Sequence, residues 1–201
     1  MSELIETMPG ANTAPPVLLL QGTGGTNREI LEFGRRLAPQ SPLLTIAGRQ
    51  GVGAQRQYYT QTASTPAQPA QVDRELRWVV AQAQLVCREH HWDVTRLVTV
   101  GYSNGAALGA YGVRRGLLPG RLALLFHPLW LTVAQPLADP QREIWLSAGQ
   151  RDPLVSPATV QKIAGACRDL GMSATVDVTG GTHQLTPQEV LAAYQWLTDR
   201  L

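Results

Sequence analysis

Short runs of consecutive apolar residues alternate along this chain with longer segments in which apolar residues recur at helical spacing. Consecutive apolar positions are typical of strands that are covered on both faces. Such runs predict strands at residues 17–20, 43–47, 97–100, 122–126 and 143–149, and the alternating run 175–178 predicts a strand with one wetter face. Residues 1–14 predict only an edge strand or a loose tail.

Amphipathic segments between these runs predict helices at residues 27–37, 72–91, 104–115, 157–170 and 187–201. Ser156 is a typical N-cap, and Thr186 opens a capping box with Glu189 before the last helix. Strands that alternate with helices predict a parallel sheet with helices on both faces. We therefore expect an α/β protein, a three-layer α/β/α sandwich that forms a single domain over residues 1–201.

The most informative motif is Gly101-Tyr102-Ser103-Asn104-Gly105, which lies between a predicted strand and a predicted helix. A serine at such a sharp turn is held out above the sheet, where a base and a substrate can reach it. The alternative is a tight turn with a spare serine. The strand before the motif and the helix after it favour the nucleophile.

Two further polar residues follow predicted strands at the same edge of the sheet, Asp152 and His183. A histidine can take the proton of an attacking serine, and a carboxylate on its other nitrogen fixes its tautomer. The order serine, acid, histidine is that of the α/β-hydrolases. Asp152 could instead begin a turn, but Asp139 lies before its strand and Asp177 lies within one, so both are weaker candidates for the acid.

Among the histidines, His183 is the only one that follows Asp152 in the chain, which favours it as the base over a simple loop histidine. His90 and His91 end a predicted helix, where a cation is favourable without any catalytic role. His127 follows a predicted strand, and we interpret it mainly as a structural or pocket-lining residue.

An oxyanion needs two backbone N–H donors, and the sequence offers Asn104, after the serine, and Thr23, in the glycine-rich loop 21–25. That loop lacks the Gly-Lys-Ser/Thr of a phosphate-binding loop and the spacing of a dinucleotide fingerprint. A nucleotide site is therefore a weak alternative.

Substrate choice is expected to come from loops at this edge. The long segment 48–70 carries Tyr58 and Tyr59, and Leu129 and Trp130 directly follow a strand. We expect Leu129 and Trp130 to wall an acyl pocket and Tyr58 or Tyr59 to cover its mouth, the alternative being that the tyrosines and the tryptophan only cover the core. A chain of 201 residues leaves no room for a large cap domain, so the cleft should be shallow and open.

Composition and charge narrow the class of protein without naming a substrate. The chain is 44% hydrophobic and 16% charged, with a net charge of +2 spread along the sequence, so no basic patch favours nucleic acid. No apolar run approaches the roughly 20 residues that span a membrane, and the N-terminus lacks the pattern of a signal peptide. Cys87 and Cys167 fall in helical patterns and indicate buried thiols in a reducing compartment, with a disulfide as the minority interpretation.

The stretches 18–25, 101–105, 149–155 and 180–184 together resemble the small single-domain carboxylesterases of the α/β-hydrolase superfamily, the phospholipase/carboxylesterase group that includes acyl-protein thioesterase-like enzymes. The resemblance implies a minimal α/β-hydrolase fold, no cofactor and no metal, hydrolysis of esters or thioesters, and a cytoplasmic location. One departure is Gln21, where the family usually has a histidine that braces the oxyanion loop. Glutamine can also donate hydrogen bonds, so we expect the loop to keep its conformation.

These observations predict a serine esterase that forms an acyl-enzyme from a small-molecule ester of modest size, as a monomer or homodimer without membrane insertion. A thioesterase is the alternative among enzymes. A ligand-binding protein with this fold and little turnover is the alternative from another class.

Overall fold

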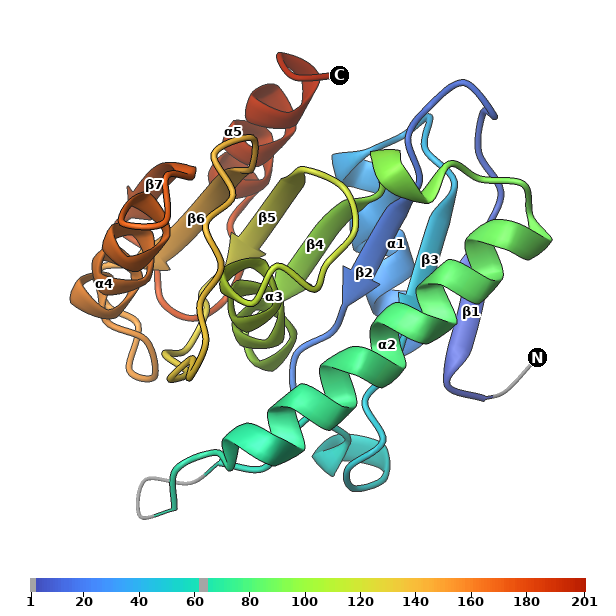
Figure 1. The fold of residues 1–201 in the computed structure, drawn as a ribbon. Helices are drawn as coiled ribbons and strands as arrows, with labels where there is room; N and C mark the ends of the chain where they lie inside the picture. The colour runs from blue at the N-terminus through green and yellow to red at the C-terminus, as the bar shows by residue number, and fades with distance from the viewer. Residues whose placement is uncertain (1–2, 62–64) are drawn as a thin grey trace.

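The computed structural model describes residues 3–61 and 65–201 and contains a seven-stranded sheet of order β1-β3-β2-β4-β5-β6-β7. The strands, drawn as arrows in Figure 1, are β1 (Ile5–Met8), β2 (Val17–Leu20), β3 (Leu43–Ile46), β4 (Val98–Tyr102), β5 (Leu122–Phe126), β6 (Glu143–Gly149) and β7 (Ser173–Thr179). The helices are α1 (Asn27–Leu37), α2 (Pro69–Glu89), α3 (Asn104–Arg114), α4 (Pro157–Arg168) and α5 (Pro187–Thr198), with short 3-10 turns η1 (Gly53–Gln55) and η2 (Val94–Arg96).

Strands β2 to β7 are parallel, and only β1 runs antiparallel, pairing with β3 so that Ile5 lies opposite Ile46. The N-terminal segment is therefore an edge strand from residue 5 onward, which decides between the two alternatives for that part of the tail. Because the parallel strands all end at one edge, the segments that follow them meet there.

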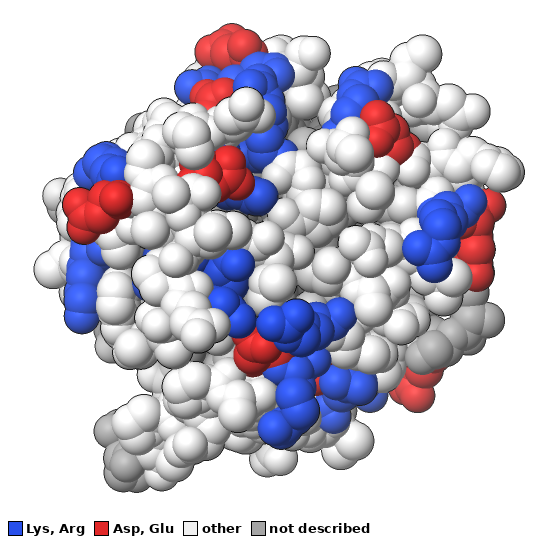
Figure 2. Space-filling model, in the orientation of Figure 1, with Lys and Arg blue, Asp and Glu red and all other residues white. Residues whose placement is uncertain are grey.

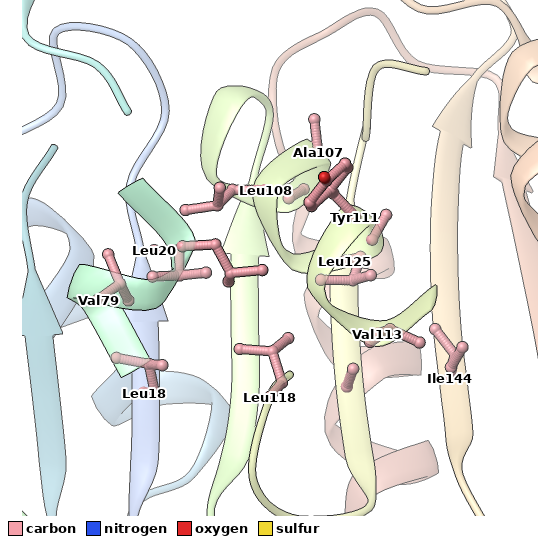
Figure 3. Close-up of a cluster of buried hydrophobic side chains, with 14 of the residues drawn as sticks. Leu18, Leu20, Val79, Ala107, Leu108, Tyr111, Val113, Leu118, Leu125 and Ile144 are labelled. Carbon is pink, nitrogen blue, oxygen red and sulfur yellow. The ribbon is translucent and has the colours of Figure 1, made fainter. Parts of the chain in front are cut away.

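Helices cover both faces of the sheet, as expected for a parallel sheet with buried strands. Leu18 and Leu20 of β2 face the cluster that includes α2, α3 and α4, whereas Val17 and Leu19 face the cluster of α1 and α5. Figure 3 shows Leu18 and Leu20 in the first cluster, with Leu20 next to Leu108 of α3. The three-layer α/β/α sandwich predicted from the sequence is confirmed.

Most predicted boundaries agree with the observed ones to within two or three residues. Helix α2 begins at Pro69 rather than at residue 72, because proline is well suited to the first helical turn, where its missing N–H costs nothing. Strand β7 extends beyond the predicted run at both ends because its full length pairs with β6. Residues 62–64 of the long loop lie outside the described residues, and the described part of that loop carries η1 and a bridge between Gln50 and Gln57.

Charged side chains of both signs are intermingled on the face shown in Figure 2. Asp73, for example, pairs with both Arg77 and Arg115. Cys87 and Cys167 are buried free thiols, as predicted. None of the described helices combines the length and apolar character that a membrane-spanning segment requires.

Candidate active site

Ser103 lies on the turn that joins β4 to α3, in a strained backbone conformation. Its φ of 52° and ψ of −113° lie in a region that residues with a side chain rarely adopt. The turn is held because the Ser103 N–H donates to the carbonyl of Phe126 at 2.9 Å and the Ser103 carbonyl accepts from Ala107 in the first turn of α3. The serine side chain is consequently presented at the edge where the parallel strands end.

Close packing requires glycine on both sides of this serine. A Cβ at Gly105 would lie 2.3 Å from the Leu20 carbonyl oxygen, and a Cβ at Gly101 would lie 2.7 Å from the Ala106 Cα. Both contacts are with backbone, which cannot move aside cheaply. The two glycines of the motif therefore let the sharp turn pack against β2 and α3.

His183 and Asp152 form a hydrogen-bonded chain with Ser103. His183 Nε2 lies 2.9 Å from Ser103 Oγ, and His183 Nδ1 lies 2.7 Å from Asp152 Oδ2. Asp152 follows β6 and His183 follows β7, so both side chains reach the serine from neighbouring loops. This geometry is that of a nucleophile, a base and an orienting acid.

The Asp152 carboxylate is fully buried and receives four donors. Its Oδ1 accepts the backbone N–H groups of Leu154 and Val155, and its Oδ2 accepts from two imidazoles. Burial alone raises the pKa of this carboxyl, but the hydrogen bonds from His183, from the two amides and from the second imidazole outweigh burial, so the pKa lies below its usual value. Asp152 is therefore ionised at neutral pH.

The loop that carries the histidine is fixed by its neighbours. The Tyr102 hydroxyl donates to the His183 carbonyl at 2.8 Å, and the Arg151 N–H donates to the Gly181 carbonyl at 2.9 Å. Burial, and then the charges of Asp152 and Glu189, raise the pKa of Tyr102 to about 12, so its hydroxyl keeps its proton and can donate. The loop that carries His183 is thus held by Tyr102 of β4 and by the loop that carries Asp152.

The glycine-rich loop and the segment after β3 are connected by Tyr58. Its hydroxyl donates to the Ile46 carbonyl at 2.7 Å and accepts the Gln21 N–H at 3.1 Å. The Gln21 side chain is buried, and its amide atoms have no hydrogen-bond partner among the described residues. The backbone of this loop is therefore tied to Tyr58, and the Gln21 side chain does not supply the brace expected from the sequence.

Asn104 joins the same segment to the serine turn. Its side-chain Oδ1 accepts the Tyr58 N–H at 2.9 Å, and its Nδ2 donates to the Tyr59 carbonyl at 3.3 Å. Thr23 and Asn104, the two expected oxyanion donors, both line the cleft that contains Ser103. The structure thus brings the two backbone segments that carry them to the nucleophile.

The cleft has a volume of about 560 Å³, which is in the range of small-ligand sites. The catalytic candidates Ser103 and His183 open into it, and its other walls are lined by Thr23, Gln57, Tyr59, Gln61, Tyr102, Asn104, Leu129, Pro153 and Leu154. Leu154 is two-thirds exposed, so this wall is open to solvent. Within the described residues, no connection between strands forms a separate cap over the cleft.

Two of the four residues expected to contact substrate lie elsewhere. Tyr58 is fully buried beneath the cleft rather than at its mouth, because its hydroxyl pairs with backbone at the ends of β2 and β3. Trp130 does not line the cleft either, because its ring packs against Lys162 at 4.0 Å and Arg114 at 4.7 Å, beside α3 and α4. Both expectations are corrected, whereas Tyr59 and Leu129 do line the cleft.

His127 has the structural position expected of it, but its partner Glu189 is not among the site residues predicted from the sequence. His127 follows β5 with a φ of 51°, is fully buried, and its Nδ1 lies 2.9 Å from Asp152 Oδ2. Its Nε2 lies 2.9 Å from Oε1 of Glu189, which is also fully buried; this contact is an ion pair whose alignment falls short of a hydrogen bond. The sequence predicts Glu189 only as part of the capping box, which it does form with Thr186.

Ligand atoms of His127, Asp152 and His183 lie within 4.8 Å of one another, a spacing that a metal ion could use. The same placement is accounted for by the hydrogen bonds of both imidazoles to Asp152 and of His183 to Ser103. A larger groove of about 750 Å³ lies between α1 and α5, on the other face of the sheet. Its lining, as far as the chain is described, includes Phe33 and Tyr194 but no serine, cysteine or histidine, so it lacks a nucleophile paired with a histidine base.

Comparison with known proteins places the chain among hydrolase-like structures. No model of a known protein family matches the sequence. "Putative hydrolase MhqD" of Bacillus subtilis (strain 168) is 29% identical over 191 residues, which cover 92% of this chain and 93% of that protein. A structure of YahD with malic acid is 29% identical and has a TM-score of 0.86, and the match covers 97% of this chain and 98% of that one.

The carboxylesterase of Bacillus cereus has a TM-score of 0.91 at 22% identity, with 98% of this chain and 94% of that chain covered. The chain therefore has the α/β-hydrolase fold in the small form of such carboxylesterases. The resemblance inferred from the sequence is confirmed at the level of the fold.

Proposed function

We propose that this protein is a serine hydrolase that cleaves a carboxylic ester of modest size through an acyl-enzyme intermediate. The observation that carries the proposal is the chain of hydrogen bonds from Ser103 Oγ through His183 to Asp152, with lengths of 2.9 and 2.7 Å. The names of the similar proteins support hydrolysis, and the carboxylesterase among them supports an ester as the substrate.

In the proposed reaction, the substrate carbonyl lies in the cleft beside Ser103. Ser103 Oγ attacks the carbonyl carbon while His183 Nε2 accepts the hydroxyl proton. Asp152 stabilises the imidazolium, and the backbone N–H groups of Thr23 and Asn104 stabilise the oxyanion. His183 then returns the proton to the leaving alkoxide, which departs as the alcohol and leaves the acyl group on Ser103.

Deacylation repeats these steps with water as the nucleophile. His183 takes a proton from the water as it attacks the acyl-enzyme, and gives it to Ser103 Oγ when the acid product leaves. The walls formed by Leu129 and Leu154 offer apolar area for an acyl chain, and the open side of the cleft suits a small, variable alcohol.

The proposal is tested with a fluorophosphonate probe and a series of aryl esters. Wild-type protein should be labelled once, on Ser103, and Ser103→Ala should lose labelling and several orders of magnitude of turnover while keeping its melting temperature, since the triad acts as a unit. Ser156→Ala removes an exposed helix N-cap serine and is the control, which should keep both the labelling and the turnover of the wild type. Near-normal turnover in folded Ser103→Ala would refute the proposal, and matched thioesters in the same assay identify the preferred acyl donor.

A further inference from the structure

His127 occupies an unusual position, because both of its ring nitrogens face carboxylate oxygens in a fully buried site. Nδ1 lies 2.9 Å from Asp152 Oδ2, and Nε2 lies 2.9 Å from Glu189 Oε1. An ionised carboxylate can only accept hydrogen bonds, and a neutral imidazole has an N–H on one nitrogen only. An imidazolium presents an N–H at Nδ1 to Asp152 and a positive charge at Nε2 to Glu189, so the two contacts favour the charged form of His127.

Besides its contact with His127, the Glu189 carboxylate has a hydrogen-bond donor at the start of α5. Its Oε2 accepts the Thr186 N–H at 3.3 Å at the N-terminus of α5, which leaves Oε1 for His127. Helix N-termini favour a negative charge. The site therefore buries two carboxylates, and two unpaired buried anions would be very costly.

Other titratable groups surround His127 and Glu189. The rings of Tyr102 on β4 and His183 lie edge-on to the His127 ring, with centroids 6.2 and 5.3 Å from its own, and Asp177 on β7 interacts electrostatically with Glu189. Within the part of the chain that the structure describes, no lysine or arginine pairs with Asp152 or Glu189. His127 is thus the residue available to balance their charge while His183 is neutral.

The direction of the His127 titration agrees with this arrangement. Burial lowers the pKa of an imidazole, but the contact and charge of Glu189, followed by those of Asp152, outweigh burial and raise the pKa of His127 above its ordinary value. For Asp177, burial and then the charge of Glu189 raise the pKa.

We propose that His127 is a positively charged positioning residue which, with Glu189 as its counter-ion, fixes the Asp152 carboxylate behind the catalytic histidine. At rest, two carboxylates and one imidazolium leave the cluster with one negative charge. When Ser103 attacks and His183 takes its proton, the cluster becomes neutral. This role rests on the proposed hydrolase function, whereas the charge of His127 does not.

The charge is measured directly by nitrogen NMR of labelled imidazoles over a pH titration. We use Ser103→Ala so that no turnover is needed, and His127→Gln in the same background to assign the signal. His127 should remain doubly protonated at neutral pH and lose its proton only well above the roughly 6.5 of an unperturbed histidine. A singly protonated His127 at pH 7 would overturn the proposal, whether or not the protein has esterase activity.

The positioning role is measured by kcat and KM in His127→Gln/Glu189→Gln, which removes both charges and keeps polar side chains. We expect kcat to fall about tenfold or more while KM changes little, because the substrate still binds in the same cleft but Asp152 is no longer fixed. His90→Gln, at the exposed end of α2, is the control and should leave kcat unchanged. An unchanged kcat in the folded double variant overturns the positioning role, and His127→Gln alone is assayed in the same way if the double variant does not fold. Absent turnover with a doubly protonated His127 would count against the proposed function alone.

Discussion

Tyr58 and Tyr59 are adjacent, both buried, and differ in what their hydroxyl groups contact. The Tyr58 hydroxyl bonds both to the Ile46 carbonyl and to the Gln21 N–H, whereas the Tyr59 hydroxyl is buried without a partner among the described residues. Removing each hydroxyl by substitution with phenylalanine therefore compares a bridging hydroxyl with an unpaired one at nearly the same place in the fold. Tyr59→Phe is the matched control for Tyr58→Phe.

The expected loss of stability in Tyr58→Phe follows from the groups that are left unpaired. A buried donor or acceptor without a partner costs about 1–3 kcal/mol, so the Ile46 carbonyl and the Gln21 N–H together should lower the free energy of unfolding by about 3 kcal/mol. For a domain of this size, that corresponds to a fall in melting temperature of about 6–12 °C. Tyr59→Phe removes an unpaired polar group, so its free energy of unfolding should change by less than about 0.5 kcal/mol.

The same substitution should affect turnover through the oxyanion loop. Gln21 is two residues before Thr23, so a loosened Gln21 N–H misplaces one proposed oxyanion donor, and we expect kcat to fall about tenfold in Tyr58→Phe. Urea denaturation and ester hydrolysis measure the two effects separately. Equal destabilisation by the two substitutions, or a larger effect of Tyr59→Phe, would refute the assignment of the Tyr58 hydroxyl as the bridge.

Three further predictions concern the acid, the cleft and pH. Asp152→Asn should keep the fold and lower turnover strongly because the amide can hold the wrong tautomer of His183, whereas Asp177→Asn should be nearly silent; the reverse result in kinetic assays would identify Asp177 as the acid. In a series of esters of increasing acyl length, Leu129→Ala should change the ranking by kcat/KM, and Trp130→Ala should lower the melting temperature without changing the ranking. Because the pKa of His127 is raised in the folded protein, its contribution to the free energy of unfolding should be complete below its unfolded pKa and be lost as pH rises through its folded pKa. Urea denaturation at rising pH measures this loss. If the wild type shows no such loss relative to His127→Gln, the prediction is contradicted.

The parts of this structure that the sequence predicts well are those that depend on local pattern and chain order. Consecutive apolar residues such as 17–20 and 122–126 form strands because both faces of a parallel sheet are covered. Ser103, Asp152 and His183 could be selected because each follows a strand, and parallel strands end at one edge. Both inferences need only the order of elements, which one sequence contains.

The parts that were not predicted depend on which way a side chain points in an irregular segment. Tyr58 and Tyr59 are adjacent in an irregular segment and both are buried in the same core cluster, but only Tyr59 also borders the cleft. Trp130 follows a strand as Leu129 does, but its ring packs against Arg114 of α3 and Lys162 of α4 and does not line the cleft. No periodicity in 48–61 or 127–131 records these directions.

The two halves of the site are joined to the nucleophile by buried polar contacts rather than by the walls of the cleft. On one side, the Asn104 side chain holds the backbone of Tyr58 and Tyr59 beside the serine turn. On the other, Asp152 is held by His127, which is held in turn by Glu189. Because these contacts lie beneath the cleft, Leu129 and other wall residues can change without moving the reacting groups. We therefore expect substitutions in the wall to alter substrate preference, and substitutions in the buried contacts to alter the rate for every substrate alike.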